Sequence, residues 1–197
     1  MSSDPKEVQD LFDRIAGCLL QAVKLNAIAF RSAGVKYANE KDFTSGGGAS
    51  YYGGRWNPPG VAAIYASLDP ATAVKESYQE FIKYGFKPGN IQPRVFAGLK
   101  LNVNRVLDLT DAKIRKKLGF SRDRLTGEDW QAIQRGGEES WTQTIGRGAL
   151  LAGFEGLLVP SARDPKGTNV VIFPRNLASP STVEVLGKEK LPPHPTK

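Results

Sequence analysis

The chain has 197 residues and a mass of 21.4 kDa, the size of one ordinary domain, and its apolar fraction of 40% excludes wholesale disorder. Its formal net charge of +7 predicts an anionic partner, which is nucleic acid, a phosphate-bearing small molecule or an acidic protein. No apolar run is long enough to cross a membrane and the first ten residues do not resemble a secretory signal, so we expect a cytoplasmic protein without membrane contact.

The first half of the chain alternates short helical and strand patterns. Aspartate followed by proline opens two helices, since the first residue caps a helix and the second suits its first turn. The expected elements are a helix from Asp4-Pro5 to about residue 19, a strand over 27–31, a flexible Gly/Ser loop over 43–54, a strand over 61–66, and a helix from Asp69-Pro70 to about Tyr84.

The second half continues the same mixture. The expected elements are strands near 94–101 and 105–109, short helices over 111–118 and 126–135, a helix over 140–152, and strands over 156–159 and 169–173. Because these elements follow no regular βαβ rhythm, the sequence predicts an α+β fold. Gly46-Gly47-Gly48 lacks the Lys-Ser/Thr of a phosphate-binding loop, so an ATPase is not favoured.

The scarcity of histidine and cysteine restricts the chemistry. The one histidine, His194, lies in a proline-rich tail, and the one cysteine, Cys18, lies in an apolar helical pattern. We therefore expect neither a histidine-activated nucleophile nor a metal site built on imidazole or thiolate ligands. Chemistry must use Arg, Glu, Asp, Ser, Tyr or Lys.

Three segments combine polar residues with glycine, proline or aromatic neighbours. In residues 53–60, Arg55 suits a phosphate group, and Trp56 is either a core anchor or a stacking surface. Tyr65 ends a strand before the helix that carries Glu76, which a helical wheel places on the exposed side. Ser161 follows an apolar strand, where it either hydrogen-bonds a ligand or caps a turn. Taken singly, each segment fits an ordinary structural role at least as well.

Together, the segments resemble the RES-domain family, which is named for its Arg, Glu and Ser. The matching stretches are FRSAG, GGRWNPPG, IYAS with ATAVKE, and GFEGLLVPSARDPKGTNVVIFP, from about Phe30 to Phe173. The resemblance implies three catalytic residues, Arg55, Glu76 and Ser161. It also implies that NAD⁺ is bound by Arg31, Tyr65 and Asn169, to which we add Trp56 as an aromatic wall.

The resemblance further implies a fold similar to ADP-ribosyltransferases, with two small, mostly antiparallel sheets around an NAD cleft and surrounding helices. We expect a helical extension over 1–26, a catalytic domain over 27–180 and a C-terminal strand and tail over 181–197. The implied activity is cleavage of the nicotinamide–ribose bond of NAD⁺ by hydrolysis or phosphorolysis. Family members are often toxins paired with a helix-turn-helix antitoxin.

As a mechanism, Glu76 would stabilise the positive charge that develops on the ribose, while Arg31 and Arg55 would hold the phosphates. Ser161 would hydrogen-bond the ribose or nicotinamide, and Tyr65 would pack on the nicotinamide side. NAD⁺ is a substrate here and no cofactor is expected; phosphate as co-substrate would need a further free arginine. Two alternative functions stay open: ADP-ribose transfer to a protein, and a nucleic-acid- or protein-binding module without activity. The first helix is either a homodimer contact or a lid.

Overall fold

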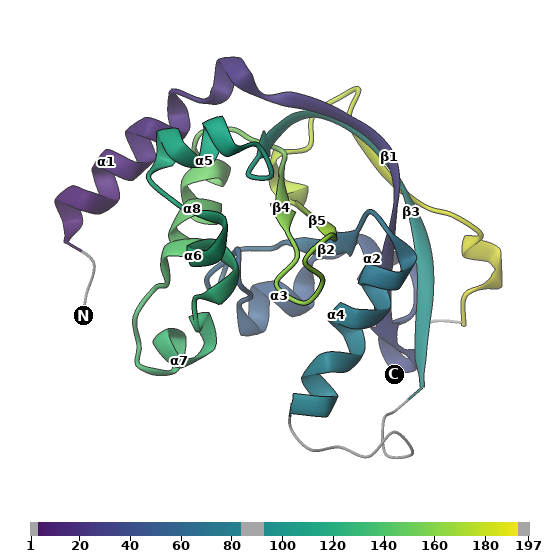
Figure 1. Ribbon diagram of the computed structural model, residues 1–197. Helices are drawn as coiled ribbons and strands as arrows, with labels where there is room; N and C mark the ends of the chain where they lie inside the picture. Colours follow the sequence, from purple (N-terminus) through teal and green to yellow (C-terminus); the bar gives the residue numbers. More distant parts are fainter. Residues whose placement is uncertain (1–3, 84–92, 193–197) are drawn as a thin grey trace.

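The computed structural model describes residues 4–83 and 93–192, so the predicted helix end near Tyr84 and His194 lie outside the described residues (Figure 1). The strands are β1 Val23–Gly34, β2 Ile64–Ser67, β3 Arg94–Asp108, β4 Gly156–Pro160, β5 Thr168–Ile172 and β6 Thr182–Val185. The helices are α1 Pro5–Ala16, α2 Glu40–Ser45, α3 Gly47–Tyr52, α4 Pro70–Lys83, α5 Ala112–Leu118, α6 Arg122–Gly127, α7 Trp130–Arg135 and α8 Trp141–Leu151. Short 3₁₀ turns lie at Leu19–Gln21, Val35–Tyr37, Pro174–Asn176 and Lys188–Lys190.

The strands form two antiparallel groups of three. In one group β3 lies between β1 and β6, and in the other β5 lies between β2 and β4. The groups are joined by parallel pairing of β3 with β4 and by one antiparallel pair, Phe30 with Ser67. The predicted α+β class with mostly antiparallel strands is confirmed. The two predicted sheets are connected into one, because β3 is long enough to pair with β1, β6 and β4.

The group β2–β5–β4 is covered on both faces. Val171 enters the core shared with the helices, while Val170 and Ile172 enter the core shared with β1 and β3. Alternate residues of a strand point to opposite faces, which explains the uninterrupted apolar run of β5. From α1, Leu11 and Ile15 are fully buried in the first core, so the N-terminal helix belongs to the same packed unit. Within the described ranges, no helix is long and apolar enough to span a bilayer.

The predicted glycine-rich loop over 43–54 is wrong, because two short helices, α2 and α3, occupy this segment. The Asn39 side chain caps α2 by accepting the Asp42 N–H at 3.0 Å, and Phe43 anchors the helix with a fully buried ring. Gly46 lies between the two helices with φ of +66°, where glycine is favoured, and the chain turns there. A residue-by-residue count of glycine and serine could not reveal this cap and anchor.

Two further predictions are corrected. The strands predicted at 94–101 and 105–109 are one strand, β3, whose alternation of buried and exposed side chains continues through Asn102 and Asn104. The helix predicted over 126–135 is two helices, α6 and α7, because Glu128 between them turns its carboxylate to the start of α8. There it accepts the N–H of Trp141 at 3.0 Å and that of Thr142 at 2.8 Å.

Helix α8 approaches the segment after α3 very closely at Gly146. A Cβ atom at this position would lie 1.7 Å from the carbonyl oxygen of Trp56. Any side chain there must push α8 and the Trp56 segment apart, because the obstacle is backbone. Gly146 is therefore required for the packing that holds the neighbouring Arg55.

We expect Gly146→Ala to lower the free energy of unfolding by about 1–3 kcal/mol, the usual cost of overpacking. Denaturant unfolding of wild type and variant measures this change. Gly127→Ala is the matched control, because a Cβ there meets nothing within 4 Å and alanine is a better helix former. Equal stability of Gly146→Ala and wild type would contradict the close packing.

Candidate active site

A cavity of about 1170 Å³ lies between β1, β2, α3, α4, α7 and the loop after β4. The sequence-predicted residues on its wall are Arg31, Arg55, Trp56, Tyr65, Glu76 and Asn169. Small-molecule sites commonly occupy about 300–1,000 Å³. The cavity is therefore large enough for an extended ligand such as a dinucleotide.

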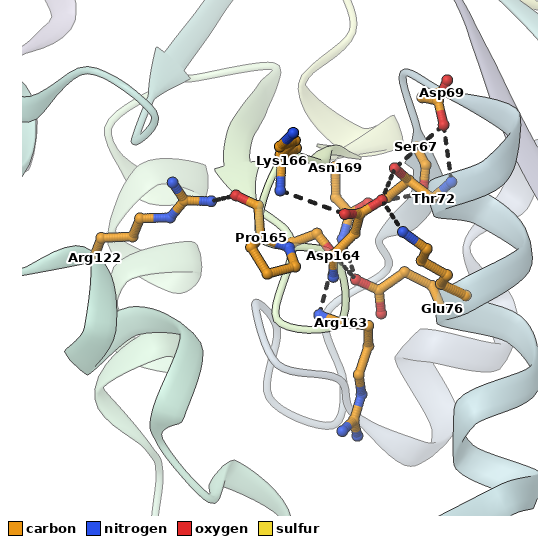
Figure 2. A network of polar contacts seen from close by, with 12 residues as sticks. Ser67, Asp69, Thr72, Glu76, Arg122, Arg163, Asp164, Pro165, Lys166 and Asn169 are labelled. Carbon is orange, nitrogen blue, oxygen red and sulfur yellow. Dashed lines mark hydrogen bonds and ion pairs between the residues drawn. The ribbon is translucent and has the colours of Figure 1, made fainter.

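Glu76 presents its carboxylate from α4 to the cavity, and one of its oxygens is fixed. Glu76 Oε1 accepts the Ser161 hydroxyl at 2.5 Å and the Asn169 amide N–H at 2.7 Å. The Ser67 hydroxyl donates to Asn169 Oδ1 at 2.7 Å, which determines which end of the amide meets the carboxylate. Figure 2 shows Ser67, Asn169 and Glu76 close together beside α4. Within the described residues, Oε2 of Glu76 has no hydrogen bond, so this oxygen is available to a ligand.

The Ser161 side chain acts on Glu76 and is not part of the cavity wall. The residue is only 3% exposed. Its oxygen accepts the N–H groups of Arg163 at 3.1 Å and Asp164 at 2.9 Å, so its own proton is directed to Glu76. The prediction that Ser161 hydrogen-bonds the ligand is therefore corrected, because its hydroxyl is buried and fully engaged. Ser161 is a positioning residue for Glu76.

Asp164 fastens the Ser161 loop to the helix that carries Glu76. Its Oδ2 lies 2.9 Å from Lys75 Nζ and accepts the Thr72 hydroxyl at 3.0 Å, and both partners belong to α4 (Figure 2). Lys75 and then Thr72 hold the pKa of Asp164 below its usual value, so the ion pair persists at neutral pH. The same helix thus supplies Glu76 and two anchors of the loop that orients it.

Two arginines of the cavity wall are held by backbone carbonyls. Arg55 Nη1 donates to the carbonyls of Leu125 at 3.1 Å and Glu128 at 3.0 Å, across the cavity from α4. Arg31 Nη1 donates to the Tyr65 carbonyl at 2.8 Å, and its buried Nε has no partner within the described residues. Burial lowers the pKa of Arg55 and lowers that of Arg31 to about 10. Burial outweighs the attraction of Glu128 and Glu76 for Arg55 and of Asp42 for Arg31, so an anion in the cavity would stabilise both guanidiniums.

The two aromatic residues differ in what they can offer a ligand. Trp56 is 2% exposed and packs in the core shared with the helices, so it offers no open ring face to a ligand. The Tyr65 hydroxyl donates to Asn57 Oδ1 at 2.7 Å and accepts the Trp56 N–H at 2.8 Å. Burial raises the pKa of Tyr65, so the hydroxyl stays protonated. Tyr65 therefore fixes the turn that carries Arg55, while its ring reaches the cavity wall.

Sequence reasoning assigned no role to several residues that build this site. Ser67 orients Asn169, and Thr72 and Lys75 contact Asp164. The signal in the sequence was position alone: Ser67 ends β2, Thr72 precedes Glu76 by one helix turn, and Lys75 is its neighbour. Arg94 lines the cavity with its guanidinium on Ser32, at 2.5 Å from the hydroxyl. Its position at the start of β3 carried no motif. Within the described residues, no group of three or more His, Cys, Asp or Glu side chains could hold a metal ion.

Positive charge outnumbers negative charge on the cavity wall. The arginines are Arg31, Arg55, Arg94, Arg135 and Arg163, and the carboxylates are Asp42 and Glu76. Guanidinium groups bind phosphate and carboxylate oxygens in a fixed, forked geometry. The wall therefore defines a site for an anionic ligand, with one oriented carboxylate at its side.

A model of the RES domain family matches residues 28–193, and the chain belongs to this family. Curated relatives named NAD(+) phosphorylase MbcT, from Mycobacterium bovis and Mycobacterium tuberculosis, are 29% identical over 133 residues. The match covers 62% of this chain and 62% of those relatives, so it spans less than two thirds of their length. The crystal structure of the M. tuberculosis MbcT–MbcA toxin–antitoxin complex is similar with a TM-score of 0.70 and 24% identity, over 89% of this chain and 88% of that chain. The resemblance to the RES family is thus confirmed, and this solved structure shares the fold.

We expect Tyr65→Phe to lower the free energy of unfolding by about 1–3 kcal/mol, because it leaves the Trp56 N–H and Asn57 Oδ1 without their partner. Thermal and denaturant unfolding measure the effect. Tyr51→Phe removes the same hydroxyl from a side chain that is 76% exposed and should change stability little. If both variants match the wild type, the Tyr65 hydroxyl does not support the turn.

Proposed function

We propose that the chain cleaves the nicotinamide–ribose bond of NAD⁺ and transfers the ADP-ribosyl group to phosphate or water. The observation that carries this proposal is the Glu76 carboxylate, held at Oε1 by Ser161 and Asn169 on the wall of an arginine-rich cavity. Membership of the RES family and relatives named NAD(+) phosphorylase support the same substrate.

The chemistry of NAD⁺ suits a site of this composition. Cationic nicotinamide leaves as a neutral base, so the site needs no strong acid. The transition state carries positive charge on the ribose, as in glycoside cleavage generally. A carboxylate whose position is fixed beforehand stabilises that charge without reorganising. We assign this role to the open Oε2 of Glu76, with Ser161 and Asn169 as positioning residues.

The arginines would bind the other end of the substrate. Burial lowers the pKa of Arg31 and Arg55, and hydrogen bonds to backbone carbonyls fix their guanidiniums, so the pyrophosphate of NAD⁺ would stabilise their charge. Tyr65 would serve by holding the Arg55 turn through its hydroxyl and by lining the cavity. Trp56 takes no part in binding in this proposal, because it is buried.

Phosphorolysis is the transfer that the relatives' name favours over transfer to a protein. In that reaction the bond between C1″ and the nicotinamide nitrogen breaks, and its electron pair leaves with nicotinamide. An unprotonated oxygen of hydrogen phosphate forms the new bond to C1″, which gives ADP-ribose 1″-phosphate. Water in place of phosphate gives ADP-ribose and one proton. Chromatography of the products separates these outcomes from protein-bound ADP-ribose.

We also infer that the chain is the toxin of a toxin–antitoxin pair. The solved structure with the same fold is a toxin–antitoxin complex, and this assembly supports a protein antitoxin as partner. That the antitoxin carries a helix-turn-helix, and that the chain forms a homodimer, stay predictions from the sequence.

We expect Glu76→Gln to lower kcat for NAD⁺ cleavage about 10²-fold or more, on the scale of losing one preorganised electrostatic contact. The fold should persist, because the glutamine oxygen still accepts from Ser161 and Asn169. The assay follows loss of NAD⁺ and appearance of nicotinamide, with and without phosphate. Glu139→Gln is the matched control, because Glu139 pairs with Arg147 and does not line the cavity. Undiminished turnover by Glu76→Gln would remove the proposed role of the carboxylate.

A further inference from the structure

Arg163 lines the cavity, and its backbone is connected to Glu76 through hydrogen bonds of Ser161. The residue is half-buried and lines the cavity, and within the described residues its guanidinium has no hydrogen bond or ion pair. Figure 2 shows its side chain extending away from the polar network around Asp164, with no contact drawn to its terminal nitrogens. Its charge is therefore free to meet a ligand.

The backbone of Arg163 is tied to the carboxylate that the reaction needs. Ser161 Oγ accepts the Arg163 N–H at 3.1 Å and donates to Glu76 at 2.5 Å, so one oxygen joins both residues. The loop is anchored on one side by Asp164 and on the other by Arg122, which donates to the Pro165 carbonyl. The Arg163 side chain thus extends from a loop whose backbone is held next to Glu76.

The other partly buried arginines of the wall already donate hydrogen bonds to neutral groups of the protein, whereas the Arg163 guanidinium donates none within the described residues. Arg31 and Arg55 each give Nη1 to backbone carbonyls, and Arg94 donates to Ser32. Arg163 also acts on Arg55, whose pKa it lowers, since two cations share one cavity. An anion between these two guanidiniums would relieve their repulsion.

We propose that Arg163 binds the acceptor, inorganic phosphate, and so selects phosphate over water as the group that attacks C1″. This inference rests on the proposed function and extends it from the substrate to the acceptor. NAD⁺ already carries two phosphate groups, so a third phosphate enters a field of negative charge and needs a cation of its own. Arg163 supplies that cation next to Glu76 and binds phosphate oxygens through two parallel N–H groups.

The test compares Arg163→Gln and Arg163→Lys with wild type in steady-state assays that vary NAD⁺ and inorganic phosphate separately. We expect Arg163→Gln to raise KM for phosphate about tenfold or more, through loss of charge-assisted hydrogen bonds. It should shift the product from ADP-ribose 1″-phosphate towards ADP-ribose, while KM for NAD⁺ changes less than about threefold. Arg163→Lys keeps the charge without the fork and should fall in between. Arg175→Gln is the matched control, because Arg175 is exposed and does not line the cavity, and it should leave both KM values unchanged.

A change in KM for NAD⁺ with an unchanged KM for phosphate would assign Arg163 to the pyrophosphate and overturn the proposal. So would an unchanged product ratio in Arg163→Gln, or a wild type that hydrolyses NAD⁺ without responding to phosphate; in that last case NAD⁺ cleavage itself still stands. If the wild type consumes no NAD⁺, the proposed function fails, and calorimetric titration with inorganic phosphate decides about Arg163. Binding to wild type that is lost in Arg163→Gln supports the phosphate site, and equal binding or no binding to either refutes it.

Discussion

The hydrogen bond from the Ser161 hydroxyl to Glu76 Oε1 connects two parts of the chain that are far apart in sequence. Ser161 has this effect because two backbone N–H groups occupy its oxygen and direct its proton. Asn169 adds a second donor from the neighbouring strand β5, with its own orientation fixed by Ser67. A flexible glutamate side chain on a helix is thereby reduced to one arrangement, which is the condition for electrostatic catalysis.

The arginines of the wall show the opposite condition. The guanidiniums of Arg31 and Arg55 are largely removed from water, and this burial lowers the pKa of both below the usual value for arginine. Such charge is retained in a fold when a ligand completes it. In this site the protein hydrogen-bonds one oxygen of the Glu76 carboxylate, while the charges of Arg31 and Arg55 are compensated only in part. An anionic substrate that develops positive charge at one end matches both features.

Much of the fold could be predicted from the sequence, and the errors have physical causes. The helix cap at Asp4 and the apolar run of β5 are local signals, and the helix and strand that they predict are present. The helices at 40–52 depend on the burial of Phe43 in a core made by distant strands, which composition does not reveal. The continuity of strand β3 through 102–104 and the break between helices α6 and α7 at 127–129 likewise depend on partners elsewhere in the chain.

The same distinction applies to the site. The helical wheel placed Glu76 on the exposed side of its helix, and this was wrong: Glu76 is half-buried at the cavity wall, while Val74 on the other side of the helix is 44% exposed. The roles of Ser161 and Trp56 could not be read from the sequence, since each depends on whether the side chain is buried. Ser161 is buried because Asp164 in the same loop contacts Thr72 and Lys75 of α4 and holds the loop against that helix.

The single pair between Phe30 and Ser67 has a mechanical consequence. It joins β1 to β2 beside the cavity, a junction called the seam here, and the Arg31 side chain of β1 donates across it to the Tyr65 carbonyl of β2. Ser67 also orients Asn169. Parting the seam would therefore separate the strand that bears Arg31 from the strands that hold Glu76 in place. This one pair therefore helps to set how far Arg31 lies from the Glu76 carboxylate, and with it the width of the cavity between them.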